Sequence, residues 1–138
     1  VVLTKGEATT GRLELNLSAQ PDLAQTLVVT CAMLGRPFRF SGLESLRIKE
    51  TDRLAALQQE LRKLGCEVVV EGDAVLRCDA PQPATVATAP IATYDDHRMA
   101  LAFAPCAYCC TGLAIEHPEV VAKSYPSFWD DLKNFEQQ

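Results

Sequence analysis

Residues 47–53, Arg-Ile-Lys-Glu-Thr-Asp-Arg, form the densest cluster of charged side chains in the sequence. Lys49 and Arg53 are four positions apart at the start of a predicted helix, so we expect them on one helix face. The free N–H groups and the dipole of a helix N-terminus attract anions, so this segment suits a phosphate or carboxylate. It also fits a solvated helix start, in which Thr51 or Asp52 caps the helix and ion pairs add little stability.

A second cluster lies at residues 94–99, Tyr-Asp-Asp-His-Arg-Met, again where a helix is predicted to begin. It combines an acid, an imidazole that titrates near neutral pH, and a guanidinium that can bind an anion through two parallel hydrogen bonds. Asp95 and Asp96 also fit a simple helix cap, and His97 fits a structural role. Taken alone, the segment is compatible with either interpretation.

Two further residues, Asp22 and Lys123, indicate a function only when they are considered together with these clusters. Alone, Asp22 is typical of a helix cap and Lys123 of a surface lysine. Yet Lys49, Arg53, Arg98 and Lys123 all fall at or near predicted helix starts, where a cation opposes the helix dipole. Charges placed against local preference indicate a site, so the four cations predict a bound anion.

Helices and strands alternate in the predicted elements that carry these residues. Hydrophobic spacing and turn residues predict helices at about 22–34, 50–64 and 96–108, and another from Pro126. They predict strands at about 1–4, 13–17, 36–43, 66–70, 74–78, 85–89 and 113–116.

The predicted order of helix, strand and helix occurs twice, which indicates an internal repeat. Asp22 and Asp96 are separated by 74 positions, and so are Lys49 and Lys123. We therefore predict one domain over residues 1–138, with repeat units at approximately 13–80 and 81–138.

Composition narrows the class of protein. The chain has 48% hydrophobic residues and a net charge of −5, which favours a folded, soluble domain and disfavours broad nucleic-acid or acidic-lipid surfaces. No hydrophobic stretch is long enough to span a membrane, and we expect a cytoplasmic protein. The six cysteines lie mostly in hydrophobic runs, which predicts reduced, buried thiols. Cys106, Cys109 and Cys110 resemble only half of a zinc site, so we expect no metal.

Four segments in order resemble the 3-phosphoshikimate 1-carboxyvinyltransferase family, also called EPSP synthases. They are Pro21-Asp22, the Ile-Lys-Glu-Thr-Asp-Arg-Leu run at 48–54, the Thr-Tyr-Asp-Asp-His-Arg-Met-Ala run at 93–100, and Ala-Lys-Ser-Tyr-Pro at 122–126. The resemblance implies an α+β, enolpyruvyl transferase-like fold, with two domains of three βαβαββ units each. This chain would hold about two units of the domain that contains the C-terminus. Its partner would be the missing N-terminal domain.

The resemblance also implies a reaction, the transfer of the enolpyruvyl group of phosphoenolpyruvate to the 5-hydroxyl of shikimate 3-phosphate. Asp22 would be the candidate base for that hydroxyl. Glu50 would move the proton of the methylene carbon, His97 would orient Glu50, and Lys123 would be a further catalytic residue. Asp96 would support the site without touching substrate.

The same resemblance assigns the binding residues. Arg53, Arg98 and Lys123 would bind phosphoenolpyruvate, and Asp22 and Lys49 would bind shikimate 3-phosphate. It implies no metal and no organic cofactor. Because both walls of the substrate cleft are needed, we expect the isolated chain to fold without being active.

Three other functions are weighed against this one. A UDP-N-acetylglucosamine enolpyruvyl transferase would share the fold, but the joint presence of the 48–54 and 93–100 segments argues against it. A non-catalytic anion-binding or scaffold domain would not need Asp22, Glu50, His97 and Lys123 together. A zinc module would need a second pair of ligands at suitable spacing.

Overall fold

One mixed sheet and four α-helices make up most of the fold, and the computed structural model describes residue 4 and residues 10–136. The sheet order is β1 (Leu13–Asn16), β2 (Phe38–Ser41), β4 (Val75–Cys78) and β3 (Val69–Glu71). β1 is parallel to β2, whereas β4 is antiparallel to both of its neighbours. The α-helices are α1 (Ala24–Met33), α2 (Arg53–Lys63), α3 (His97–Phe103) and α4 (Phe128–Glu136). The strand predicted at 1–4 lies outside the described residues, except for residue 4.

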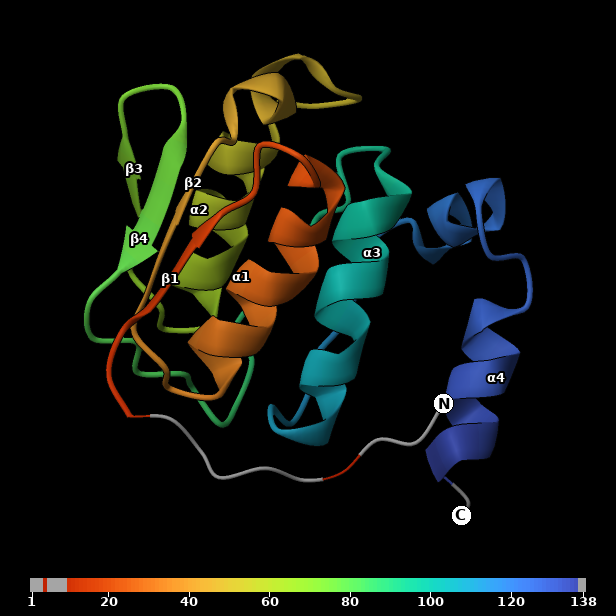
Figure 1. The fold of residues 1–138 in the computed structure, drawn as a ribbon. Helices are drawn as coiled ribbons and strands as arrows, with labels where there is room; N and C mark the ends of the chain where they lie inside the picture. Colours follow the sequence, from red (N-terminus) through yellow and green to blue (C-terminus); the bar gives the residue numbers. More distant parts are fainter. Residues whose placement is uncertain (1–3, 5–9, 137–138) are drawn as a thin grey trace.

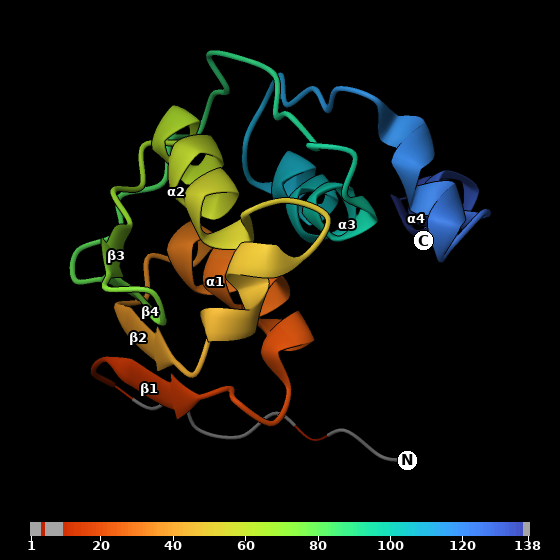
Figure 2. The ribbon, with the colours of Figure 1, turned by 90° about the horizontal axis from the view of Figure 1, so that it is seen from above.

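The elements are arranged in layers. α1 and α2 cover one face of the sheet, and α3 lies against α1 on the side away from the sheet (Figure 1). The view from above shows the same order, with α4 outermost (Figure 2). Because α1 is covered on both sides, its sequence is largely apolar and most of its residues are buried.

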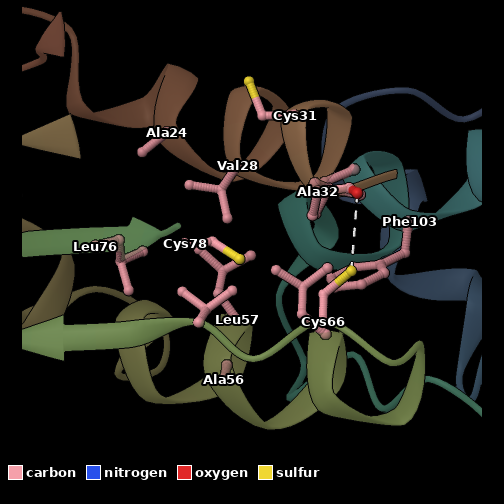
Figure 3. Packing of buried hydrophobic residues seen from close by; sticks show 14 of the residues in the cluster. Ala24, Val28, Cys31, Ala32, Ala56, Leu57, Cys66, Leu76, Cys78 and Phe103 are labelled. Carbon is pink, nitrogen blue, oxygen red and sulfur yellow. Dashed lines mark hydrogen bonds between the residues drawn. The ribbon is translucent and has the colours of Figure 1, made fainter. Parts of the chain in front are cut away.

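The hydrophobic core lies between the sheet and the helices. Phe38 and Phe40 of β2 are fully buried. Figure 3 shows side chains of α1, α2 and β4 meeting in this core, and the Cys66 thiol donating to the Ala32 carbonyl at 3.7 Å. All six cysteines are free, and five of them are buried, as predicted. Cys109 is the exposed cysteine.

The sequence misplaces the start of α2 by a few residues. Asp52 caps this helix, because one of its carboxylate oxygens accepts hydrogen bonds from the N–H groups of Leu54 and Ala55, both at 3.1 Å. Lys49 and Glu50 therefore precede the helix and follow a 3₁₀ helix at Glu44–Ile48. The prediction that Lys49 and Arg53 share a helix face is wrong.

The described strands are shorter than predicted, the one predicted at 36–43 being Phe38–Ser41, and two predicted strands are absent. The strand predicted at 66–70 begins at Val69, because the N–H of Cys66 closes the end of α2 on Leu61 O at 3.0 Å. The strands predicted at 85–89 and 113–116 reduce to two isolated parallel bridges, Val86 to Thr111 and Ile91 to Ile115. Pro90 lies between the bridges and has no N–H to continue a ladder.

From β1 to β4 the elements follow the order βαβαββ. Residues 79–136 contain α3, α4 and the two bridges in place of full strands. The division into repeat units near 13–80 and 81–138 stays a prediction. None of the described helices is long and apolar enough to cross a membrane.

Candidate active site

Arg53 is the centre of the candidate site. It is the first residue of α2, and its side chain is only 2% exposed. The guanidinium donates to three carboxylates: to Asp96 through Nε at 2.6 Å, to Asp22 through Nη1 at 3.0 Å, and to Glu50 through Nη2 at 2.7 Å. A charge this deeply buried is stable only when it is paired, and here three acids share it.

Asp96 connects α3 to this centre. Its side chain is fully buried and caps α3, because Oδ1 accepts a hydrogen bond from the Arg98 N–H at 2.9 Å. The same carboxylate pairs with Arg53, so one acid both caps α3 and ties its first residue to the start of α2. The supporting role expected for Asp96 stays a prediction.

Asp22 gathers the other cations. It lies in a 3₁₀ turn at Pro21–Leu23, which contacts the 3₁₀ helix that leads to Lys49. Its Oδ1 lies 3.0 Å from Arg53 and 3.9 Å from the Lys49 ammonium, and its Oδ2 accepts from Arg98 Nη2 at 3.2 Å. Asp22 is therefore no helix cap, since its carboxylate is engaged by side chains from other segments.

Lys123 joins the cluster through a neighbouring residue. It ends the 3₁₀ helix at Pro118–Lys123, which packs against α3. Its ammonium donates to the Asp95 carbonyl at 2.8 Å and to the Asp95 carboxylate at 3.0 Å. Lys49, Arg53 and Arg98 share the Asp22 carboxylate, whereas the Lys123–Asp95 pair adjoins that cluster along the chain, because Asp95 directly precedes Asp96. The sequence did not identify Asp95 as the partner of Lys123.

Glu50 and His97 lie close to this cluster along the chain, but the expected contact between them is missing. The Glu50 carboxylate contacts Arg53, and the hydrogen bonds of the described residues include none from Glu50 to His97. His97 Nδ1 is buried and has no hydrogen-bond partner in the part of the chain that the structure describes. The proposed orienting role of His97 is therefore not seen in this arrangement.

Several buried polar residues near these segments escaped the sequence analysis. Glu60 is fully buried on α2 and binds the residues just before Asp95. The side chains of Gln25 and Thr93 are buried, and neither has a hydrogen-bond partner within residues 10–136. A signal for Glu60 existed, because it is an acid on the leucine-rich face of the helix between Leu57 and Leu61.

The electrostatics of the cluster are balanced in this structure. Four cations, Lys49, Arg53, Arg98 and Lys123, face four acids, Asp22, Glu50, Asp95 and Asp96. The Lys49 and Arg98 side chains are each 37% exposed and Lys123 is 47% exposed, so these three can reach a dissolved anion. Arg53 would have to release an acid first.

Two neighbouring groups have shifted pKa values. Partial burial opposes ionisation of Asp52, but hydrogen bonds from Arg47 and from the backbone of Ala55 outweigh it and lower the pKa of Asp52. Burial, followed by the hydrogen bond to Glu60, raises the pKa of the Tyr94 hydroxyl. Among the described residues, no three His, Cys, Asp or Glu side chains gather as a metal ion would require.

Fold and site together define an α+β domain with a cluster of paired acids and cations suited to small anions. The family model of EPSP synthase (3-phosphoshikimate 1-carboxyvinyltransferase) matches residues 3–132. The chain belongs to this family.

Individual relatives support the assignment. A 3-phosphoshikimate 1-carboxyvinyltransferase of Bacteroides fragilis is 49% identical over 131 residues, which cover 95% of this chain and 32% of that protein. The enzyme of the same name from Cellvibrio japonicus is 40% identical over 139 residues, covering 94% of this chain and 32% of that protein. The chain thus spans about a third of the length of these curated relatives.

A solved structure matches the fold. The EPSP synthase from Acinetobacter baumannii superimposes with a TM-score of 0.69 at 22% identity, over 83% of this chain and 27% of that one. This likeness confirms the predicted α+β, enolpyruvyl transferase-like fold.

Proposed function

We propose that this chain is part of an enzyme that transfers the enolpyruvyl group of phosphoenolpyruvate to the 5-hydroxyl of shikimate 3-phosphate, a step of aromatic amino-acid synthesis. The observation that carries the proposal is the Asp22 carboxylate, which Arg53, Arg98 and Lys49 all approach from different segments. This arrangement joins a candidate base to several anion-binding cations. The names of the relatives support the same reaction.

The cations bind the substrates in this proposal. Arg98 and Lys123 are exposed enough to meet the carboxylate and phosphate of phosphoenolpyruvate, and Lys49 meets shikimate 3-phosphate. A guanidinium can hold a carboxylate or phosphate through two parallel hydrogen bonds. Arg53 serves as a third ligand of phosphoenolpyruvate once Glu50 or Asp22 moves away. Positive charge around the phosphate stabilises the charge that builds up as it leaves.

The acids move the protons. Asp22 accepts the proton of the attacking 5-hydroxyl, whose oxygen bonds to C2 of phosphoenolpyruvate while Glu50 protonates the methylene carbon. The resulting tetrahedral intermediate then loses a methyl proton to Glu50 and expels phosphate. In the substrate complex, His97 orients Glu50. Because side chains carry out all these steps, we propose no metal and no organic cofactor.

The chain supplies one wall of the substrate cleft in this proposal. The relatives are about three times as long as the part that matches, so the opposite wall belongs to a partner domain. Transition-state stabilisation depends on ligands held from both sides. The isolated chain is therefore expected to fold and to show no turnover.

Phosphate release tests the proposal in the full-length reading frame that contains this chain. The frame is assayed with both substrates as the unsubstituted protein and as Asp22→Ala and Glu50→Gln. Each substitution should lower kcat by about 10²–10⁴-fold, the usual contribution of a general acid or base. Glu67→Gln is the matched control, because the Glu67 side chain is 73% exposed and, among the described residues, its ion-pair partner is Arg62 alone.

Three results would contradict the proposal. Full activity in both Asp22→Ala and Glu50→Gln would remove the catalytic assignments. Absence of turnover in the unsubstituted frame, with both substrates still bound in calorimetry, would favour a non-catalytic anion-binding domain. Turnover with UDP-N-acetylglucosamine as the acceptor would redirect the proposal to the related transferase.

A further inference from the structure

The segment that carries Asp96 and Arg98 follows a strained turn. Tyr94 and Asp95 both have a φ of 55°, in the left-handed region that residues with a side chain rarely adopt. Two such residues in succession persist only where surrounding contacts hold them in place. The turn directly precedes α3, so its shape sets where that helix and its first side chains lie.

Glu60 of α2 makes the hydrogen bonds that hold the N-terminal side of this turn. Its carboxylate is fully buried, and Oε1 accepts the Tyr94 hydroxyl at 2.7 Å. Oε2 accepts the Ala92 N–H at 2.9 Å and lies 2.6 Å from the Lys63 ammonium. Lys63 also donates to the Pro90 carbonyl at 2.9 Å. A single buried acid thus fastens residues 90–94 to α2.

The spacing of two residues on α2 determines what this contact achieves. Arg53 and Glu60 are seven positions apart, which is about two helical turns and places both on the same side of the helix. Arg53 holds Asp96, after the strained turn, and Glu60 holds Ala92 and Tyr94, before and within it. The rigid helix therefore fixes the turn at both ends.

We propose that Glu60 is a positioning residue, which sets the 93–96 turn and thereby places Arg98 at the anion site. The inference rests on the proposed function, in which Arg98 binds phosphoenolpyruvate. A carboxylate is required because three donors converge on it. Glutamine has one acceptor oxygen and a donor in place of the second, so at least one donor would lose its acceptor.

Steady-state kinetics of the full-length reading frame test this role. Glu60→Gln should raise the KM for phosphoenolpyruvate by about tenfold or more, as for other residues that support a ligand. The KM for shikimate 3-phosphate should change less, because Lys49 lies outside the turn and Asp22 keeps its contacts with Arg53 and Lys49 when Arg98 shifts. Tyr94→Phe removes one hydrogen bond of the three, so it should shift the same KM by less. Glu67→Gln should change neither KM.

Each alternative outcome overturns a specific statement. Equal changes in both KM values would show that Glu60 has a general structural role. The same conclusion would follow if kcat fell only in proportion to the fraction of folded protein, as measured by circular dichroism. If Glu60→Gln does not fold, an unchanged KM for phosphoenolpyruvate in Tyr94→Phe would refute the inference.

Hydrogen exchange separates this inference from the proposed function. If the unsubstituted protein shows no turnover, the proposed function is refuted. The exchange rates of the 94–98 amides still report how firmly the 93–96 turn is held. These amides should exchange faster in Tyr94→Phe and Glu60→Gln than in Glu67→Gln. Equal exchange in all three variants would overturn the role of Glu60.

Discussion

Arg53 and Asp96 form a buried ion pair of two hydrogen bonds, with Nε to Oδ2 at 2.6 Å and Nη2 to Oδ1 at 3.3 Å. The residues are 43 positions apart and join the start of α2 to the start of α3. Asp96 is fully buried and Arg53 is its charged partner, so the Asp96 charge depends on Arg53 for its stability, whereas Arg53 also pairs with Asp22 and Glu50.

Removing one partner should therefore destabilise the chain strongly. Arg53→Met leaves the Asp96 charge buried without a partner, and should lower the free energy of unfolding by about 3–5 kcal/mol. The double variant Arg53→Met/Asp96→Leu should be more stable than Arg53→Met, despite losing the α3 cap, which contributes about 1 kcal/mol. Urea unfolding of the 138-residue chain measures both values. Additive losses would contradict the dependence of one charge on the other.

The cap of α2 yields a pH-dependent prediction. Asp52→Ala should cost about 1 kcal/mol through the lost cap. Asp52→Asn should cost less than Asp52→Ala, because asparagine also caps a helix. It still loses the ion pair with Arg47, since its side chain carries no charge. The folded pKa of Asp52 is lowered, so its ionised form stabilises the chain above the unfolded pKa of about 3.9, and this contribution disappears as pH falls through the folded pKa.

Urea unfolding at pH 7 and near pH 3 measures this difference. The gap between the unsubstituted chain and Asp52→Asn should narrow at the lower pH. A gap that stays constant across this range would show that the ion pair with Arg47 is irrelevant.

Two glycines with left-handed backbone should differ in their tolerance of alanine. A Cβ on Gly42, where φ is +76°, would lie 2.6 Å from the Ser18 backbone nitrogen and 2.6 Å from Asn16 Oδ1. Gly72, at φ +57°, has no atom within 4 Å of that position. Gly72→Ala should cost about 1–2 kcal/mol for backbone strain alone. Gly42→Ala should cost about 1–3 kcal/mol more, because a crowded backbone must shift.

Thermal unfolding of both alanine variants compares the two sites directly. Equal losses of stability would mean that the loop at Ser18 moves aside at no cost. This result would contradict the close packing found between the ends of β1 and β2.

Thiol alkylation should separate the cysteines by burial. Desolvation, with a smaller contribution from Cys78, raises the pKa of Cys66 to about 11. Burial and the neighbouring Cys109 and Cys110 raise the pKa of Cys106 to about 12. At pH 8 a thiol of pKa 11 is ionised in only about one molecule in a thousand, and the thiolate is the reactive form.

Iodoacetamide at pH 8 should therefore modify Cys109 first and leave Cys66 and Cys106 intact until the chain is unfolded in denaturant. Peptide mass spectrometry identifies the modified residues. Early modification of Cys66 in the folded chain would contradict its burial against α1.

The sequence located the chemically important segments but not all of their contacts. Asp52 was recognised as a possible cap, because a cap depends on residues within one turn. Asp22 was expected to cap a helix when taken alone, yet it binds Arg53, Arg98 and Lys49. Lys49 was placed on the helix face of Arg53, although both reach Asp22 by different routes. Local rules cannot predict a partner that arrives from another element.

By itself, the sequence determined the residue types, the caps, the tight turns and the membership in a family, all of which depend on short stretches of chain. Only the tertiary structure decided which acid meets which cation, and that Glu60 and Arg53 hold the same turn from one helix. The physical reason is range. Caps and turns form between neighbours, whereas buried ion pairs form only after packed helices bring distant residues within hydrogen-bonding distance.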